Sequence, residues 1–263
     1  MKSQVDAGRL RDSLADCPLV QALEVVEEID STNLELLRRL DEREMESVEG
    51  TLLVACHQTR GRGRRERHWH SAEGGNLLCS LAMRPSLPRE SWGWLAQIAG
   101  LAVADAIVGL TGLDARIKWP NDVFIKGGKV AGVLVESRVS AERGAAVIGV
   151  GINVGSHPEL DDSDAVIATS LKEHWEDPVE LETLCVRYVN SLERCIDLAS
   201  GDPDQLRKAL GARSMILGQR VVAECDGREI KGVAESIGSG GSLILRTDEG
   251  AVPISVVERL RLI

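Results

Sequence analysis

The chain has 263 residues, 43% of them hydrophobic and 27% charged, which is enough to bury the core of one large domain and a small one. Its formal net charge of -10 argues against nucleic acid or an anionic membrane as the default partner, because phosphate groups are held mainly by clustered lysine and arginine. The first residues lead into no apolar signal region, and we expect no apolar run long enough to span a bilayer, so the sequence predicts a cytoplasmic protein without a membrane partner.

The N-terminal part is expected to open the fold with a strand and a helix. Alternating apolar residues over Leu23–Ile29 predict a strand, and Asp30–Glu35 has the composition of a helix start. Thr32 and Glu35 have the spacing of a capping box, in which two side chains satisfy free backbone N–H groups at the helix N-terminus.

The middle of the chain contains several short apolar runs and one long one. The long run, from Trp94 to about Leu110, predicts a central helix packed on a sheet. We expect strands at Thr51–His57, Asn76–Met83, Ala115–Trp119, Val130–Val139 and Ala146–Val154. Because strands and helices are mixed rather than strictly alternating, an α+β fold is favoured over a doubly wound sheet.

The C-terminal part differs from the rest of the chain in its residue pattern. An acidic loop over Gly155–Val166 and helices at Val179–Leu198 and Pro203–Leu210 come first. From about Ser214, β-branched runs separated by glycine turns predict a small β-barrel of roughly fifty residues. We therefore expect a large domain over residues 1–212 and a barrel domain over residues 213–263.

A loop rich in arginine and glycine runs from Gln58 to about Ser71. Five arginines fall within eight positions, namely Arg60, Arg62, Arg64, Arg65 and Arg67. Arginine pairs well with carboxylates and phosphates, and the intervening glycines let the backbone approach a ligand. On its own the loop fits a phosphate site and a solvated or nucleic-acid-binding loop equally well. A dinucleotide fingerprint is disfavoured, because position 66 is Glu66 and no helix opens there.

The segment Lys118–Asp122, with the sequence KWPND, places a cation, an amide and a carboxylate around a proline. Proline cannot sit in a central strand, so the segment should end a strand and expose its polar groups. It could be a simple turn in which Asn121 and Asp122 bond their own backbone. A hairpin through the turn at Lys126 would instead bring Lys118 and Lys129 together near Asp122.

Two glycine-rich segments resemble nucleotide loops only superficially. No helix pattern follows Gly149–Gly155, so we expect Ile148–Val154 to be a strand whose backbone is closely approached, with Asn153 as its polar inward residue. Gly238–Ser242 lies between two strand runs and is expected to be a flexible turn without a catalytic role.

Neither cysteine nor histidine spacing predicts a metal site. The five histidines contain no helical H-x-x-x-H pair, and the cysteines contain no C-x-x-C pair. We expect six free thiols, most of them buried, rather than disulfides. These residues are Cys17, Cys56, Cys79, Cys185, Cys195 and Cys225.

Taken in chain order, these segments resemble the biotin-protein ligase family. The resemblance covers about residues 22 to 263, and its ordered set of motifs is highly specific although each is weak alone. The residues that carry it are Asp30–Asn33, Gln58 with Gly61–Arg65, Trp69 with Ser71 and Asn76, Lys118–Asp122, Lys129 with Gly132, and Gly149–Asn153.

The resemblance implies a mixed-sheet catalytic domain of the class II aminoacyl-tRNA synthetase-like type, followed by an SH3-like β-barrel. It implies a ligase that uses ATP and Mg2+ to convert biotin into biotinyl-5'-AMP, and then transfers biotin to a lysine of a biotin carboxyl carrier domain. Exposed strand edges in a mixed sheet would also permit a homodimer.

Site residues follow from the same resemblance. Biotin contacts are implied for Ser31, Thr32, Asn33 and Gln58, and further ligand contacts for Gly61, Arg62, Gly63, Trp69, Gly132 and Asn153. Catalytic roles are implied for Arg64, Lys118, Asp122 and Lys129; the two lysines would handle the α-phosphate and the biotin carboxyl group. Asp122 would lie near magnesium, directly or through phosphate or water, or near the incoming amine.

Two features depart from parts of the family. Glu66 stands where family loops often carry glycine, which places an anionic residue in a loop that handles an anionic ligand. About thirty residues precede the Ser31–Asn33 turn, too few for the winged helix-turn-helix of repressor-type members, so no DNA partner is expected.

Two other functions would fit some of these residues. A lipoate-protein ligase shares the chemistry, but the dense arginine-glycine loop and the KWPND segment resemble the biotin branch. A nucleic-acid-binding module would use the basic loop and the barrel, and it would bind in a salt-sensitive way. That second alternative leaves Lys118–Asp122 unexplained.

Overall fold

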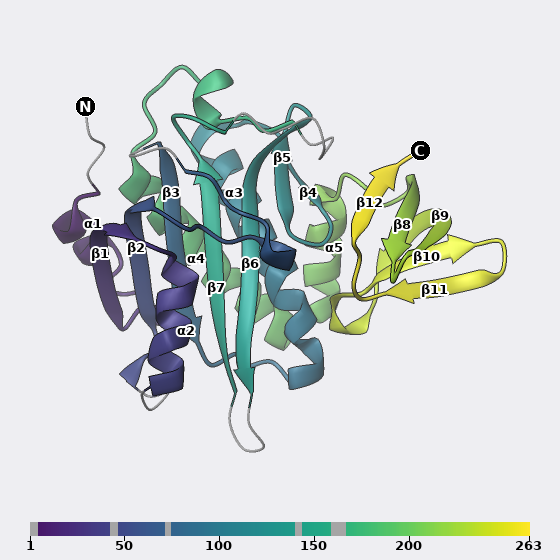
Figure 1. Ribbon diagram of the computed structural model, residues 1–263, viewed down its shortest axis with the longest axis horizontal. Coiled ribbons are helices and arrows are strands. Elements are labelled where there is room, and N and C mark those ends of the chain that lie inside the picture. Colours follow the sequence, from purple (N-terminus) through teal and green to yellow (C-terminus); the bar gives the residue numbers. More distant parts are fainter. Residues whose placement is uncertain (1–4, 43–46, 72–74, 140–143, 159–166) are drawn as a thin grey trace.

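In the computed structural model, a large mixed sheet lies between helices on its two faces, and a smaller antiparallel sheet follows at the C-terminal end (Figure 1). The structure describes residues 5–42, 47–71, 75–139, 144–158 and 167–263. This arrangement confirms the predicted mixed α+β class.

The large sheet has seven strands in the order β1-β2-β3-β7-β6-β5-β4. Strand β1 runs parallel to β2, and every other neighbouring pair is antiparallel. Its strands are β1 (Ala22–Ile29), β2 (Thr51–Gln58), β3 (Asn76–Met83), β4 (Ala115–Lys118), β5 (Asp122–Ile125), β6 (Gly128–Val139) and β7 (Gly144–Asn153). Strands β3, β7 and β6 are central, so side chains near the ends of these strands are held by pairing on both sides.

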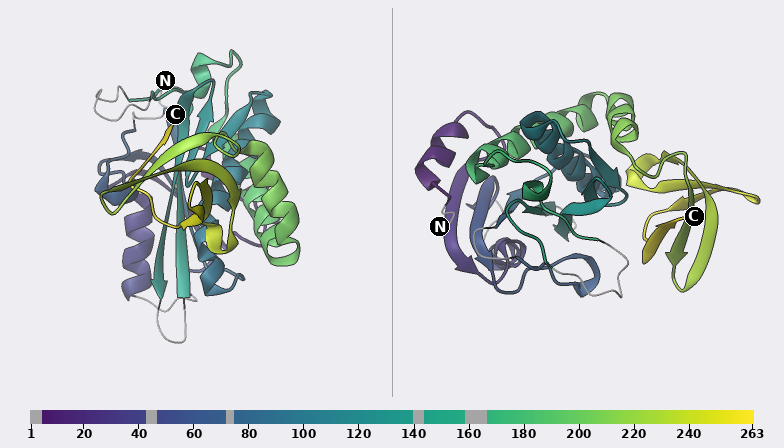
Figure 2. Two further views of the ribbon diagram at one scale, coloured as in Figure 1. Left: turned by 90° about the vertical axis from the view of Figure 1, so that its right-hand side faces the viewer. Right: turned by 90° about the horizontal axis from the view of Figure 1, so that it is seen from above.

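Five α-helices and four short 3-10 turns complete the described chain. The α-helices are α1 (Ala7–Ser13), α2 (Thr32–Glu42), α3 (Leu95–Thr111), α4 (Leu181–Gly201) and α5 (Pro203–Arg213). The 3-10 turns are η2 (Arg64–Glu66), η3 (Arg89–Trp94), η5 (Leu171–Glu173) and η6 (Ser239–Gly241). Helix α2 covers one face of the large sheet, whereas α3 and α4 cover the other (Figures 1 and 2).

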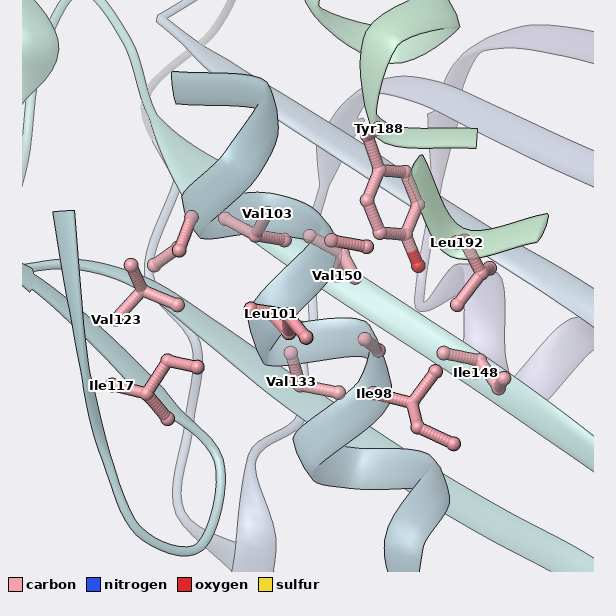
Figure 3. Packing of buried hydrophobic residues seen from close by; sticks show 14 of the residues in the cluster. Ile98, Leu101, Val103, Ile117, Val123, Val133, Ile148, Val150, Tyr188 and Leu192 are labelled. Atoms are coloured by element: carbon pink, nitrogen blue, oxygen red, sulfur yellow. The ribbon is translucent and has the colours of Figure 1, made fainter. Parts of the chain in front are cut away.

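The main core lies between the sheet and helices α3 and α4. Ile98 and Leu101 of α3, Ile148 of β7 and Tyr188 of α4 are all buried there (Figure 3). Residues that point to the opposite face, such as Leu53, pack under α2 instead. Successive side chains of a strand point to opposite faces of the sheet, so the same strands contribute apolar residues to the cores on both faces.

One apolar helical segment needs an explanation. Among the described residues, Arg89–Thr111 is long and apolar enough to cross a membrane by length and composition alone, but 67% of its most apolar 18-residue window is buried inside the protein. Helix α3 is buried on most sides because it packs against both the sheet and α4. Its apolar composition is thus explained by the core.

The C-terminal unit is a five-stranded antiparallel sheet in the order β11-β10-β9-β8-β12. Its strands are β8 (Arg220–Cys225), β9 (Arg228–Ile237), β10 (Leu243–Thr247), β11 (Gly250–Ile254) and β12 (Arg259–Leu262). The sheet lies at one end of the molecule, with β12 nearest to the large sheet (Figure 1). The predicted change to short strands after Ser214 is confirmed.

Two local features differ from the expectations, and one agrees with them. Helix α1 was not predicted; it is short, it buries only Leu10, and Asp6 caps it. Strand β5 was not predicted because its four residues follow directly on the KWPND segment, which has the composition of a turn. The six cysteines are free, as expected.

The predicted capping box at the start of α2 was also wrong. Ser31 caps the helix, because its Oγ accepts a hydrogen bond from the backbone N–H of Leu34 at 3.4 Å. Thr32 is already the first helical residue, and its hydroxyl points into the sheet. Glu35 pairs with Arg39 at 2.9 Å rather than with the helix N-terminus.

Candidate active site

Polar residues from distant parts of the chain surround one cavity of about 690 Å³. It lies over the large sheet and reaches the start of β12, where residues Val257–Arg261, which lead into and open this strand, form part of its wall. The predicted site residues that line it are Ser31, Thr32, Asn33, Gln58, Arg62, Gly63, Arg64, Trp69, Lys118, Asp122, Lys129, Gly132 and Asn153. Gly61 lines a second, smaller hollow on the other side of the loop.

At one end of the cavity, Thr32, Gln58 and Ser80 form a buried hydrogen-bond network. The Oε1 atom of Gln58 accepts from the backbone N–H of Thr32 at 2.7 Å and from its hydroxyl at 3.0 Å. The Thr32 hydroxyl also lies 2.6 Å from the Oγ atom of Ser80. These bonds fix the Gln58 side chain with its amide oxygen toward α2, so its NH2 group is the end left to donate.

Asn33 extends this network across the sheet. Its Oδ1 accepts from Ser80 at 2.7 Å, and its Nδ2 donates to a carboxylate oxygen of Glu136 at 3.0 Å. The side chain lies so close over Gly149 that a Cβ there would collide with the Asn33 amide. The prediction that something approaches the Gly149–Gly155 strand closely is therefore confirmed at this position.

The arginine-glycine loop folds back on itself as a narrow hairpin. The backbone N–H of Trp69 donates to the carbonyl of Gly61 at 2.9 Å, and Arg62 forms an isolated antiparallel bridge with His68. A Cβ at Gly61 would collide with the Trp69 carbonyl. Gly61 therefore allows the two arms of the loop to pack closely, and it does not line the main cavity.

Two arginines of the loop turn toward the cavity and find partners there. Arg62 pairs with Glu136 at 3.2 Å, and an Nη atom of Arg64 donates to Oδ1 of Asn121 at 3.2 Å. Burial lowers the pKa of Arg64, although the nearby charge of Asp122 opposes that shift. A partly desolvated guanidinium beside a carboxylate is well placed to bind an anion.

The predicted meeting of Lys118, Asp122 and Lys129 is confirmed. Strand β4 places Lys118 opposite Asp122, and the Nζ atom of Lys129 lies 2.7 Å from Oδ1 of Asp122. Burial lowers the pKa of Lys118, Asp122 opposes this shift, and Lys129 adds to it. Asn121 bonds Val133 on the neighbouring strand at 2.7 Å, so the segment is not the self-bonded turn considered above.

The indole of Trp69 lies against the glycines of the central strands. A Cβ on Gly132 would come 3.1 Å from its ring, and a Cβ on Gly151 would come 2.6 Å from Nε1. Lys129 Nζ lies 5.7 Å from the ring centroid, close enough for a cation–π attraction. The Nε1 atom is buried and has no hydrogen-bond partner among the described residues, so it is a donor available to a ligand.

Asn153 is held with one of its polar atoms unused. Its Nδ2 donates to the carbonyl of Thr169 at 3.0 Å, while Oδ1 is buried and finds no partner in the described part of the chain. Buried polar atoms are nearly always hydrogen-bonded. This oxygen therefore marks a place where a ligand donor would be favoured.

Comparison with known proteins accounts for this collection of residues. Residues 25–153 match the Biotin/lipoate A/B protein ligase family. A biotin--[acetyl-CoA-carboxylase] ligase of Mycobacterium tuberculosis is 35% identical over 97% of this chain and 95% of that protein. The chain belongs to the biotin-protein ligase family. A ligase of the same description from Paracoccus denitrificans is 34% identical over 87% of this chain and 96% of that protein.

Solved structures of this family share the fold. A biotin protein ligase from Aquifex aeolicus, described in complex with biotin and ATP, matches with a TM-score of 0.77 at 28% identity. The match covers 92% of this chain and 99% of that chain. The fold described above is therefore similar to that of a biotin protein ligase over most of the chain.

Sequence reasoning missed several residues of the site. Ser80 is fully buried and was hidden inside the apolar run of β3, where a lone serine was the only signal. Glu136 connects Asn33 to Arg62, but nothing in its local sequence marks it. Residues Val257–Arg261 line the cavity because of tertiary docking alone. The side chain of Glu66 lies outside the described residues.

Proposed function

We propose that this chain is an ATP-dependent biotin-protein ligase. It forms biotinyl-5'-AMP from biotin and ATP, and then transfers biotin to a lysine of a biotin carboxyl carrier domain. Its curated relatives bear the name of this activity, and the Aquifex aeolicus relative is described with biotin and ATP bound. The cavity offers one end lined by hydroxyl and amide groups, beside the Arg62–Glu136 ion pair, and a cationic end, as the two substrates require.

The hydroxyl and amide end, Ser31 to Asn33 with Gln58, is the proposed biotin site. Its groups are already ordered by Ser80 and by one another, so little conformational entropy is lost when a ligand arrives. Trp69 supplies an apolar face and an N–H donor beside this end. Biotin would lie with its ring system here and its carboxyl group toward Lys129.

The cationic end is the proposed site of adenylation. A carboxylate must attack the α-phosphorus of ATP, and the developing charge has to be neutralised. Lys118, Lys129 and Arg64 converge around Asp122 for this purpose. The loop Gly61–Trp69 covers the cavity and would shield the mixed anhydride from water. Asn153 would accept a hydrogen bond from the adenylate.

Magnesium fits this site as an ion that arrives with ATP. Within the described ranges no group of three or more histidine, cysteine, aspartate or glutamate side chains could hold a metal ion. Magnesium is commonly bound through one or two carboxylates together with substrate phosphates. Asp122 would be the carboxylate that holds it, and the ion would supply neutralising charge to the phosphates.

In the second step the ε-amine of an acceptor lysine attacks the mixed anhydride. With a pKa near 10.4, only about one amine in a few thousand is neutral at pH 7. Asp122 is the group placed to accept the amine proton, because its carboxylate lies among the cations that held the phosphate. AMP is the leaving group.

Several finer features belong to the same proposal. Residues 1–212 would form a class II synthetase-like catalytic domain, and residues 213–263 an SH3-like barrel built on the five-stranded sheet. The partner would be a carboxylase carrier domain in the cytoplasm, with no DNA partner. A homodimer could form through an exposed sheet edge.

The convergence of Lys118, Asp122 and Lys129 beside the Thr32–Gln58–Ser80 network is the observation that carries this function. The test is mass-detected transfer of biotin, in the presence of ATP and magnesium, to a purified carrier domain. A mass increase on one lysine, absent without ATP, is expected. Transfer of lipoate instead would favour the alternative that the shared family name permits.

A further inference from the structure

The glycine turn Gly238–Ser242 is a docking point and not a free turn. The carbonyl oxygen of Gly241 accepts a hydrogen bond from Nε2 of Gln97 at 2.6 Å and another from Nε1 of Trp119 at 3.0 Å. Both donors belong to side chains that are almost fully buried. One backbone carbonyl of the C-terminal unit therefore satisfies two buried donors of the large domain, using both of its lone pairs.

The packing around this carbonyl leaves no room for side chains. Gly241 has φ +82°, and a Cβ there would come 2.6 Å from the Gly93 carbonyl oxygen. A Cβ on Gly240, which has φ +71°, would come 2.8 Å from the carbonyl oxygen of Glu90. On the opposite side, a Cβ on Gly93 would collide with the Gly240 carbonyl. Two backbones thus meet face to face, which only glycine permits.

Trp119 connects this docking point to the cationic end of the cavity. It lies in the chain between Lys118 and Asn121, and it lines the cavity itself. The chain that leads into the C-terminal unit also contacts the same strand, because the backbone N–H of Met215 donates to the carbonyl of Ile117 at 3.0 Å. Strand β4 and the KWPND segment are therefore held by two hydrogen bonds, one at Trp119 and one at Ile117.

The other end of the C-terminal unit reaches the arginine loop. Glu258 lies 3.6 Å from an Nη atom of Arg65, and residues Val257–Arg261 line the cavity. A displacement of the Gly241 turn would therefore move both the cavity wall formed by Val257–Arg261 and the KWPND segment. The biotin end would not move with them, because Thr32, Gln58 and Ser80 lie on α2, β2 and β3.

We propose that Gly241 is a positioning residue for adenylation: its carbonyl, bound to Trp119 and Gln97, sets the place of Lys118 and Asp122 and of the β12 wall around ATP. The inference rests on the proposed function and adds to it a specific coupling between the C-terminal unit and the first half-reaction. It predicts a defect in the use of ATP that leaves biotin binding intact.

The test compares two variants of the full chain with a matched control. Gly241→Ala adds a Cβ where the Gly93 backbone lies, and Gln97→Met removes one donor while keeping the length of the side chain. Gly227→Ala is the control, because Gly227, in the turn between β8 and β9, has the similar φ of +71° but nothing within 4 Å of an added Cβ. Each protein is assayed by biotin-dependent ATP–pyrophosphate exchange, by calorimetric titration with biotin alone and by thermal unfolding.

We expect kcat/KM for ATP to fall about tenfold or more in Gly241→Ala and Gln97→Met, the scale of one lost buried hydrogen bond. The biotin Kd should stay within about twofold of wild type, and Gly227→Ala should behave as wild type. Normal ATP use in both variants, or a parallel loss of biotin affinity, would overturn the inference. If Gly241→Ala does not fold, Gln97→Met alone decides. Wild-type protein without biotin-dependent exchange would instead reject the proposed function, and this inference with it.

Discussion

The Nζ atom of Lys129 lies 2.7 Å from Oδ1 of Asp122, across two neighbouring strands of one hairpin, and both side chains are about three-quarters buried. In such a partly desolvated place each charge is held by the other, because an unpaired charge would be costly. The pair fixes a lysine where the biotin carboxyl group and the α-phosphate would meet.

Replacing Lys129 should abolish adenylation. Lys129→Met removes the cation and leaves Asp122 to repel the phosphates, so the rate of biotin-dependent ATP–pyrophosphate exchange should fall by about 10²–10³-fold. Lys126→Gln is the matched control, since Lys126 is exposed at the tip of the same hairpin. An exchange rate equal to wild type in Lys129→Met would remove Lys129 from the site.

Arg64 should retain the adenylate. Arg64→Ala removes a partly buried guanidinium that bonds Asn121, so the adenylate should dissociate about ten times faster, the effect of one charge-assisted hydrogen bond. Release of radiolabelled biotinyl-adenylate from a gel-filtered complex measures this rate. Arg60→Ala serves as control, because Arg60 is 75% exposed and pairs only weakly with Asp30. Equal release rates from both variants would contradict the assignment.

Lys118 should set the alkaline limit of adenylation. Burial lowers its pKa below the ordinary lysine value, so it loses its proton, and its ability to neutralise phosphate, at a lower pH than an exposed lysine. The pH profile of kcat/KM for exchange should therefore decline on the alkaline side below about pH 10.4. In Lys118→Arg the decline should move to higher pH. A decline at the same pH in both proteins would assign it to another group.

Ser80 should support the biotin site from beneath. Ser80→Ala deprives buried Asn33 and Thr32 of a partner, which costs about 1–3 kcal/mol, so biotin affinity should fall by about tenfold. Titration calorimetry with biotin measures the loss, and Ser137→Ala at the exposed end of β6 provides the control. Unchanged affinity in Ser80→Ala would mean that the network does not position biotin contacts.

Gly151 should be required for the placement of Trp69. Gly151→Ala forces the indole away from the sheet, because the new Cβ would lie 2.6 Å from its Nε1 atom. We expect weaker biotin binding, by about tenfold or more, from the resulting displacement of a packed aromatic residue. Gly201→Ala, at the end of α4 with open space around it, should bind biotin as wild type does. Equal binding by both variants would show that Trp69 does not line the biotin site.

Sequence patterns predicted the elements whose signals are local. The apolar run Asn76–Met83 was expected to be a strand with the bounds that β3 has. The close approach over Gly149–Gly155 was also expected, because glycine in a buried strand needs a reason. The meeting of Lys118, Asp122 and Lys129 could be predicted from the sequence only because they lie on three consecutive short strands, β4, β5 and β6, joined by tight turns.

The remaining features depend on tertiary contacts that local sequence does not encode. The Gly238–Ser242 turn has the composition of a flexible connection, yet the carbonyl of Gly241 receives two buried donors from parts of the chain more than 100 residues away. Ser31 rather than Thr32 caps α2, because the Thr32 hydroxyl is engaged by Ser80 across the sheet. In each case a partner distant in sequence decides the role.

Biotin-dependent ATP–pyrophosphate exchange by the purified wild-type chain tests the central claim most directly. The account predicts that labelled pyrophosphate enters ATP only when biotin and magnesium are present, because adenylation of biotin is the step that is reversed. Exchange that proceeds equally without biotin, or no exchange when biotin is present, would contradict the assignment of this cavity to biotin activation.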